Sequence, residues 1–284
     1  MRSSNPVFSR RGFSRDNGYA GFQAQQQPQA GNPYATNPYA QQANPYAQPQ
    51  TAGSPYAAPP AAPPQAGRMT MDDVVARTGT TVGLVIVAAA VAWVTDMSLG
   101  LAVGAALVAM VLSLIQAFKR KAVPALILAY AVFEGLFLGA LSNFVDGYVN
   151  GAAMQAVIGT MAVFAAVLVL YKTRIIRVTQ RFYRFVMAAA IGFVLLMAVN
   201  MLFAVFGGGD GLGFRSGGLG ILFGVIGIVL GALFLALDFK QVEDGIAYGA
   251  PKEESWLAAF GLTLTLVWIY MEFLRLVAIL QGDN

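Results

Sequence analysis

Seven long apolar runs constrain the fold of this chain more than any other feature of its sequence. A helix that crosses a bilayer needs about 20 consecutive, mostly apolar residues. From Thr78 onward such runs follow one another, at residues 79–95, 98–118, 122–145, 152–171, 183–206, 217–239 and 256–280. Charged residues make up only 11% of the chain, whereas a soluble domain carries about 25%. The runs predict an all-α bundle of seven transmembrane helices over residues 69–284, embedded in the lipid bilayer.

Residues 1–68 differ in composition from the rest of the chain. They are rich in Pro, Gln, Asn, Tyr and Ala, and the unit Asn-Pro-Tyr-Ala recurs at 32–35, 37–40 and 44–47. A segment with so few aliphatic residues cannot build a core, which predicts a disordered tail. An alternative is that the repeated Tyr-Pro units form a multivalent segment that binds a protein partner.

Basic residues gather in every second connection between the predicted helices. They are Lys119, Arg120 and Lys121, then Lys172, Arg174, Arg177, Arg181 and Arg184, then Lys240 and Lys252. The other connections carry Asp96, Asp146, Asp210 and one cation, Arg215. Connections rich in Lys and Arg stay on the cytoplasmic side of a membrane. We therefore expect a multi-pass plasma-membrane protein with a cytoplasmic N-terminal tail and its C-terminus outside.

Small residues mark one face of the sixth predicted helix. Its glycines are spaced by 4, 3 and 4 residues, at Gly220, Gly224, Gly227 and Gly231. This spacing places them on one helical face, where a neighbouring backbone can approach closely. Asp238 follows Gly231 by seven residues and so lies on the same face, turned toward protein. The alternative is that Asp238 ends the helix at the cytoplasmic boundary, beside Lys240.

The seventh predicted helix has a polar stripe. Its small and polar residues recur on one side, at Gly261, Thr265, Trp268, Glu272 and Arg275. One polar face on a helix surrounded by other helices is typical of a cavity lining.

The third predicted helix adds a further acid, Glu134, beside a row of small residues. A helix rises 1.5 Å per residue, which places Glu134 about 18 Å, Thr265 about 14 Å and Glu272 about 24 Å from the cytoplasmic ends of their spans. We therefore expect Glu134 and Glu272 to share a level. Asp238, near the boundary, is expected to lie too far from Glu272 to touch it.

Ionisable groups within a bilayer point to function, because a charge there costs on the order of 3 kcal/mol. When ionised, Asp238, Glu134 and Glu272 can attract a hard cation such as Ca²⁺; when protonated, they cannot. With Arg275 as a counter-charge, they predict a pH-gated cation path. The alternative is that Arg275 extends outward to the interface and Glu272 is a single hydrogen-bonded packing residue.

Catalysis is disfavoured by what the chain lacks. It contains no cysteine and no histidine, so it has neither the ligands of a typical zinc site nor the base of a serine triad. We expect no enzymatic activity, no resident cofactor and no nucleic-acid partner.

Three stretches carry a resemblance to a known family. They are FEGLFLGALSNF at 133–144, ALDFKQVEDGIAYGAPKEESW at 236–256 and GLTLTLVWIYMEFLRLVAIL at 261–280. With them, the chain from Met69 to Leu280 resembles the Bax inhibitor-1/YccA-like membrane proteins, most closely their actinobacterial branch. The resemblance implies seven helices with the last one central, and a proposed pH-dependent Ca²⁺ leak. It also implies a link to stress or death suppression and, in bacteria, to modulation of a membrane protease.

The resemblance also implies a pH sensor built from two aspartates, one on helix six and one on helix seven. Asp238 matches the first, but alignment on Arg275 puts Thr265 at the second. Glu272 lies two turns further along the same face and is the candidate replacement, unless the pH gate is absent. Two hypotheses follow: a pH-sensitive Ca²⁺ leak, or a non-conducting regulator that binds a membrane protease or another membrane protein.

Overall fold

The structure is a computed structural model, and it describes residues 67–119, 121–207 and 211–282. The described residues form seven long helices and no strand: α1 (Met71–Val94), α2 (Leu99–Phe118), α3 (Pro124–Asp146), α4 (Ala152–Lys172), α5 (Gln180–Gly207), α6 (Gly217–Ala247) and α7 (Ser255–Gly282). All seven are long and apolar enough to cross a membrane. The predicted all-α, seven-span fold is confirmed. Residues 1–66 of the predicted tail lie outside the described residues.

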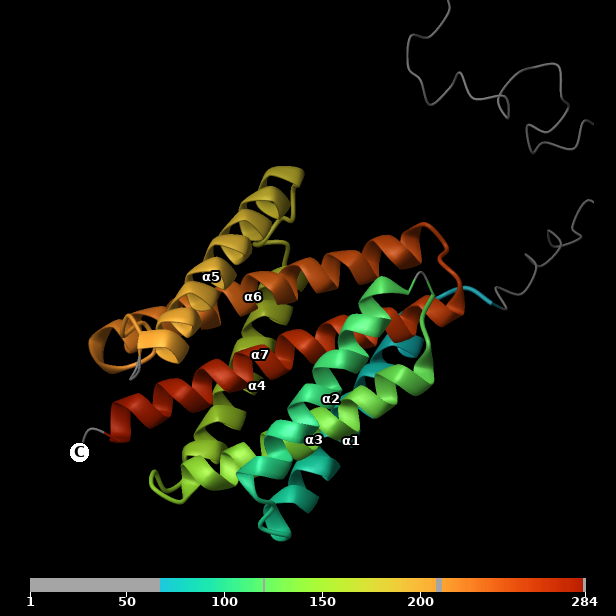
Figure 1. Ribbon diagram of the computed structural model, residues 1–284. Helices are drawn as coiled ribbons and strands as arrows, with labels where there is room; N and C mark the ends of the chain where they lie inside the picture. The colour runs from blue at the N-terminus through green and yellow to red at the C-terminus, as the bar shows by residue number, and fades with distance from the viewer. Residues whose placement is uncertain (1–66, 120, 208–210, 283–284) are drawn as a thin grey trace, which may run out of the picture. The chain divides into compact units, whose positions relative to one another are not determined.

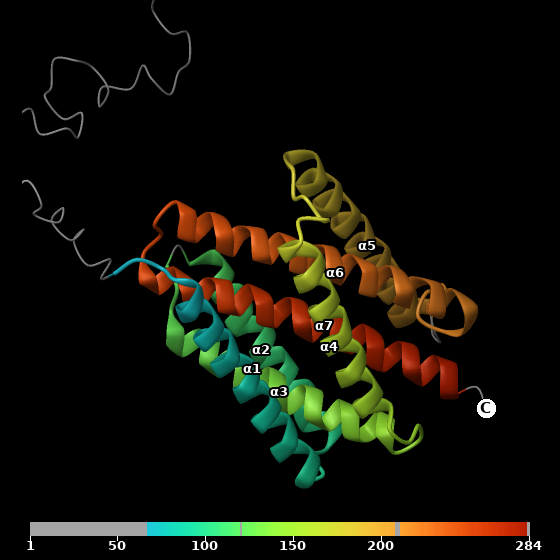
Figure 2. The same ribbon diagram turned by 180° about the vertical axis from the view of Figure 1, so that it is seen from behind.

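The last helix is the central one, as the resemblance implies. α7 packs against α1, α3, α4 and α6, and it runs between these helices in Figures 1 and 2. α5 packs mainly against α6, at the side of the bundle. Polar side chains on α7 therefore face other helices.

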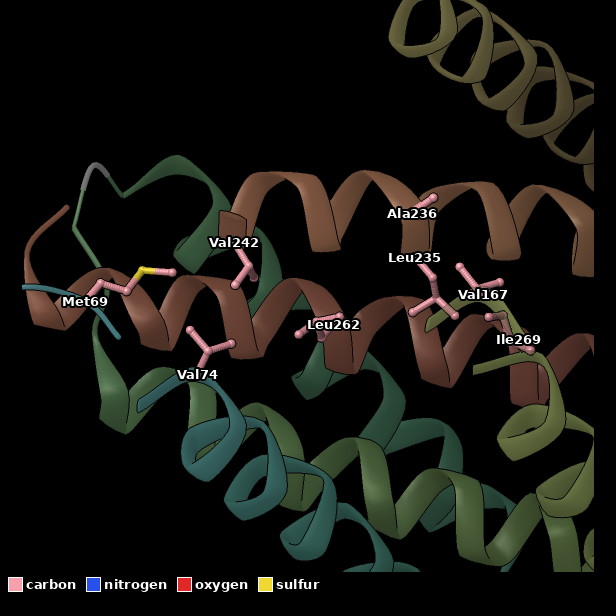
Figure 3. Packing of buried hydrophobic residues seen from close by; sticks show 8 residues of the cluster. All are labelled: Met69, Val74, Val167, Leu235, Ala236, Val242, Leu262 and Ile269. Carbon is pink, nitrogen blue, oxygen red and sulfur yellow. The ribbon is translucent and has the colours of Figure 1, made fainter. Parts of the chain in front are cut away.

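A hydrophobic cluster joins α7 to its neighbours (Figure 3). Its buried members come from the residues before α1 and from α1, α4, α6 and α7: Met69, Val74, Val167, Leu235, Ala236, Val242, Leu262 and Ile269. This cluster runs along the α6–α7 interface. It fixes the position of the two helices that carry Asp238 and Thr265.

α1 and α6 extend furthest past the apolar runs that predicted them. α1 begins at Met71 because the Thr70 side chain accepts a hydrogen bond from the Asp73 amide and caps the helix. α6 continues to Ala247 rather than ending at residue 239. In this extension Lys240 forms a salt bridge to Asp244 at 2.9 Å, a spacing that stabilises a helix outside the bilayer.

The four glycines of α6 lie against α7. A Cβ atom built on Gly231 would be 2.5 Å from Ile269 Cγ1, and one built on Gly227 would be 2.9 Å from Glu272 Cδ. Such distances are too short for real side chains, so glycine is required for this close approach.

The residues before α1 form a strap across the α6–α7 connection. The Met69 amide donates to the Ala250 carbonyl at 2.8 Å, and the Lys252 amide donates to the Gly67 carbonyl at 2.9 Å. Arg68 thereby pairs in an antiparallel bridge with Pro251. Gly67 and Arg68, the last two residues of the predicted tail, thus belong to this strap.

Candidate functional site

A cavity of about 660 Å³ lies between α2, α3, α6 and α7. Its wall is mostly apolar, and its polar members are Ser113, Tyr130, Glu134, Asp238 and Thr265. Two carboxylates from different helices thus line one cavity inside the predicted span. The cavity brings together three of the five predicted ion-pathway residues.

Asp238 and Thr265 are joined directly across the α6–α7 interface. The Thr265 hydroxyl donates to Asp238 Oδ2 at 2.7 Å. Gly261, one turn before Thr265, leaves room for the carboxylate, because a Cβ atom there would be 3.6 Å from Asp238 Oδ1. Threonine therefore occupies the place that the resemblance gives to a second aspartate. It supplies a neutral donor there instead of a charge.

Asp238 lies within its helix and not at its end. It precedes the last residue of α6, Ala247, by nine residues, which corresponds to about 14 Å along the axis. Thr265 follows the first residue of α7, Ser255, by ten residues, or about 15 Å. The alternative in which Asp238 ends its helix is therefore wrong, because α6 continues to Ala247, eight residues past the predicted end at residue 239.

Glu134 lies on α3 and lines the same cavity as Asp238. It follows Pro124 at the start of α3 by ten residues, so it is about 15 Å along its helix, at the level of Asp238 and Thr265. Glu272 is about 26 Å along α7 and is not among the cavity-lining residues. The second carboxyl group on the wall of this cavity is therefore that of Asp238 and not that of Glu272, the acid expected at the level of Glu134.

Glu272 instead forms an ion pair with Arg275, one turn further along α7. Both side chains are buried, with 7% and 14% of their surface exposed. The Glu272 carboxyl group lies against Gly227, and Arg275 Nη1 donates to the Gly220 carbonyl at 3.4 Å. Arg275 thus turns toward α6 and does not extend outward to the interface.

A second arginine lies near this ion pair. Burial lowers the pKa of Arg215, in the connection before α6; the charge of Arg275 lowers it further, while Glu272 opposes the change. The far half of the α6–α7 interface therefore holds two arginines and one glutamate, whereas the described residues that line the cavity include two carboxyl groups and no basic residue.

Sequence reasoning missed two polar members of the cavity. Tyr130 lies one turn before Glu134, on the same face of α3, and packs edge-on against Phe260 at 5.2 Å. The four-residue spacing could have predicted this position, because residues four apart lie on the same face of a helix. Ser113 comes from α2, and its hydroxyl donates to the carbonyl of Met110 within its own helix. An isolated serine in an apolar helix carries no signal of that kind.

The wall of the cavity provides only part of a coordination shell for a metal ion. Among the residues that the structure describes, no group of three or more Asp, Glu, His or Cys is placed to hold a metal. Calcium takes about six to eight oxygen ligands. Two carboxylates and three hydroxyl groups on the cavity wall provide only part of such a shell, and water would have to supply the rest.

One family model matches nearly the whole chain. The model described as Bax inhibitor 1 like covers residues 5–282, which include all seven helices. A search of curated proteins gives no match.

Proposed function

This chain belongs to the Bax inhibitor 1 like family of membrane proteins, and we propose that it is a pH-sensitive leak path for Ca²⁺ that serves ion homeostasis or the stress response. The observation that carries the proposal is the cavity in which Glu134 and Asp238 face a common space. We assign the role of the titrating acid pair to these two residues.

Electrostatics supports this assignment. Two carboxylates on the wall of one cavity, surrounded by apolar helices, create a negative potential that attracts a cation far more strongly than the same groups would in water. Protonation removes that attraction. The flux of Ca²⁺ should therefore fall as the cavity is acidified.

Thr265 explains why the acid pair spans α3 and α6. The resemblance implies aspartates on helices six and seven, but helix seven here offers Asp238 only a hydroxyl group. Glu134 restores a second carboxylate to the same cavity from α3. Glu272, the replacement that the sequence suggested, is already neutralised by Arg275.

We propose that the Glu272–Arg275 ion pair closes the cation path beyond the cavity. It lies about 11 Å further along α7 than Thr265, with its carboxyl group against the glycine face of α6. A cation leaving the cavity in that direction meets the positive charges of Arg275 and Arg215. Conduction would then require α6 and α7 to separate at this level.

Flux into liposomes tests the proposal. Purified protein is reconstituted in liposomes that contain a Ca²⁺-sensitive dye, and Ca²⁺ entry is followed between about pH 6 and pH 8. We expect entry above that of empty liposomes, a lower rate at the acidic end, and loss of the pH dependence in Asp238→Asn. Absence of Ca²⁺ entry at every pH would refute the leak function.

A non-conducting regulator is the second candidate, and the position of α5 favours it. This helix packs mainly against α6 and exposes large apolar side chains along its length, including Ile191, Leu195 and Leu202. Such a face suits contact with a membrane protease or another membrane protein. Deleting residues 1–66 tests the contribution of the tail: loss of a cellular stress phenotype with unchanged Ca²⁺ flux would support this second function.

A further inference from the structure

A second cavity, separate from the acid pair, opens between α1 and α4. Its volume is about 600 Å³, and α3 and α7 also contribute to its wall. Much of its surface comes from exposed apolar side chains: Ile86 and Val94 of α1, and Met154, Val157 and Met161 of α4. All of these residues lie in membrane-spanning helices. The groove is therefore open to the lipid of the bilayer.

The hydroxyl groups on the wall of this groove already have partners. Ser142, Thr160 and Thr263 each donate to the carbonyl four residues earlier in their own helix, at 2.6–2.7 Å. Ser142 also bonds to the Tyr270 hydroxyl at 2.5 Å. The serine and threonine hydroxyl groups of the wall are thus satisfied, so the part of the groove away from Asp146 offers a ligand mainly apolar contacts.

The groove lies between α1 and α4 and has apolar side chains on both walls. An acyl chain, which is thin and flexible, suits a groove of this kind.

One end of the groove is acidic. Asp146, the last residue of α3, belongs to its wall, and Asp146 Oδ1 accepts a 3.4 Å hydrogen bond from the Ala153 amide. The connection from Gly147 to Gly151 contains no lysine or arginine. A lipid headgroup that carries an ammonium group complements this charge, and an anionic headgroup does not.

We propose that the groove between α1 and α4 is a binding site for phosphatidylethanolamine, with an acyl chain along its apolar wall and the ammonium group at Asp146. The site is independent of the proposed Ca²⁺ path. Its role would be to fill the α1–α4 gap and hold both helices against α7.

Native mass spectrometry tests the site. The protein is reconstituted in nanodiscs of phosphatidylethanolamine, phosphatidylglycerol and phosphatidylcholine in equal parts, released, and weighed with its retained lipid. We expect one retained phosphatidylethanolamine. Val157→Trp and Ile86→Trp fill the groove from opposite walls and should lower retention by about tenfold. Val229→Trp, on an exposed face of α6 outside both cavities, is the matched control and should retain the lipid.

A charge variant tests the headgroup. Asp146→Asn keeps an oxygen for the Ala153 amide but removes the negative charge, so it should lower the preference for phosphatidylethanolamine over phosphatidylglycerol by up to about fivefold. Equal retention in the groove variants and the control, or an unchanged preference in Asp146→Asn, would overturn the proposal. So would a photo-crosslinker at Met161 that labels another protein in native membranes instead of lipid.

Discussion

At the α6–α7 interface, the Thr265 hydroxyl group donates a hydrogen bond to the Asp238 carboxyl group. Replacing Thr265 with valine keeps the shape of the side chain and removes its hydroxyl group. Asp238 then loses its donor, and the free energy of unfolding should fall by about 1 kcal/mol. Denaturation in detergent measures this change. Thr265→Ser retains the donor, and a loss as large as that of the valine variant would contradict the role of the hydrogen bond.

Arg275 and Glu272 form a buried ion pair, and its two members should be coupled in stability. Arg275→Met leaves the Glu272 carboxylate buried without its partner, which should cost about 3–5 kcal/mol. The double variant Glu272→Gln/Arg275→Met removes both charges and should recover most of that loss. The same denaturation assay measures both proteins. If the double variant is less stable than Arg275→Met, the two charges do not offset the cost of burying each other.

At the scale of elements, the glycine face of α6 sets how closely α6 and α7 approach. Gly231→Ala places a methyl group against Ile269, which should destabilise the protein by about 1–3 kcal/mol. Gly192, in α5, faces open space, because a Cβ atom there would have no neighbouring atom within 4 Å. Gly192→Ala is thus the matched control, and it should be neutral or stabilising by up to about 1 kcal/mol, because alanine favours helix. Equal effects at both glycines would show that close packing is not the cause.

The elements themselves could be predicted from the sequence, because long apolar runs identify spanning helices directly. Their ends could not. Hydropathy falls where α6 leaves the bilayer, but the Lys240–Asp244 pair continues the helix to Ala247. Asp238 lies at the level of Thr265, whose hydroxyl group donates a hydrogen bond to it. The resemblance to the family had already put these two residues at the two positions of a pair.

The partner of Glu134 could not be predicted, because it depends on which helices adjoin. Height along a helix was the only measure that the sequence offered, and it put Asp238 near the end of its apolar run, far from Glu134. Glu272 was then the nearest acid in height. The structure shows Glu134 and Asp238 on the wall of one cavity, with Glu272 held by Arg275.

At the scale of the whole molecule, the strap from Gly67 to Thr70 ties the start of the bundle to the α6–α7 connection. Met69 is 5% exposed and packs in the α6–α7 cluster, and Lys252 forms a 3.0 Å salt bridge to Asp73. A chain that starts at Gly67 keeps these contacts, whereas one that starts at Met71 loses Met69 and the Thr70 cap. The shorter chain should unfold at a lower temperature in detergent. Equal unfolding temperatures would show that the strap adds no stability.

The central claim is that Glu134 and Asp238 act as one acid pair, and the coupling of their effects on Ca²⁺ entry tests it most directly. Initial rates are measured in liposomes at neutral pH for wild type, Glu134→Gln, Asp238→Asn and the double variant. We predict that each single variant lowers the rate on the order of tenfold, equivalent to about 1.4 kcal/mol, and that the double variant is no slower than either one. Glu272→Gln should leave the pH dependence of entry in place. Single effects that multiply in the double variant, or loss of pH dependence in Glu272→Gln alone, would contradict the claim.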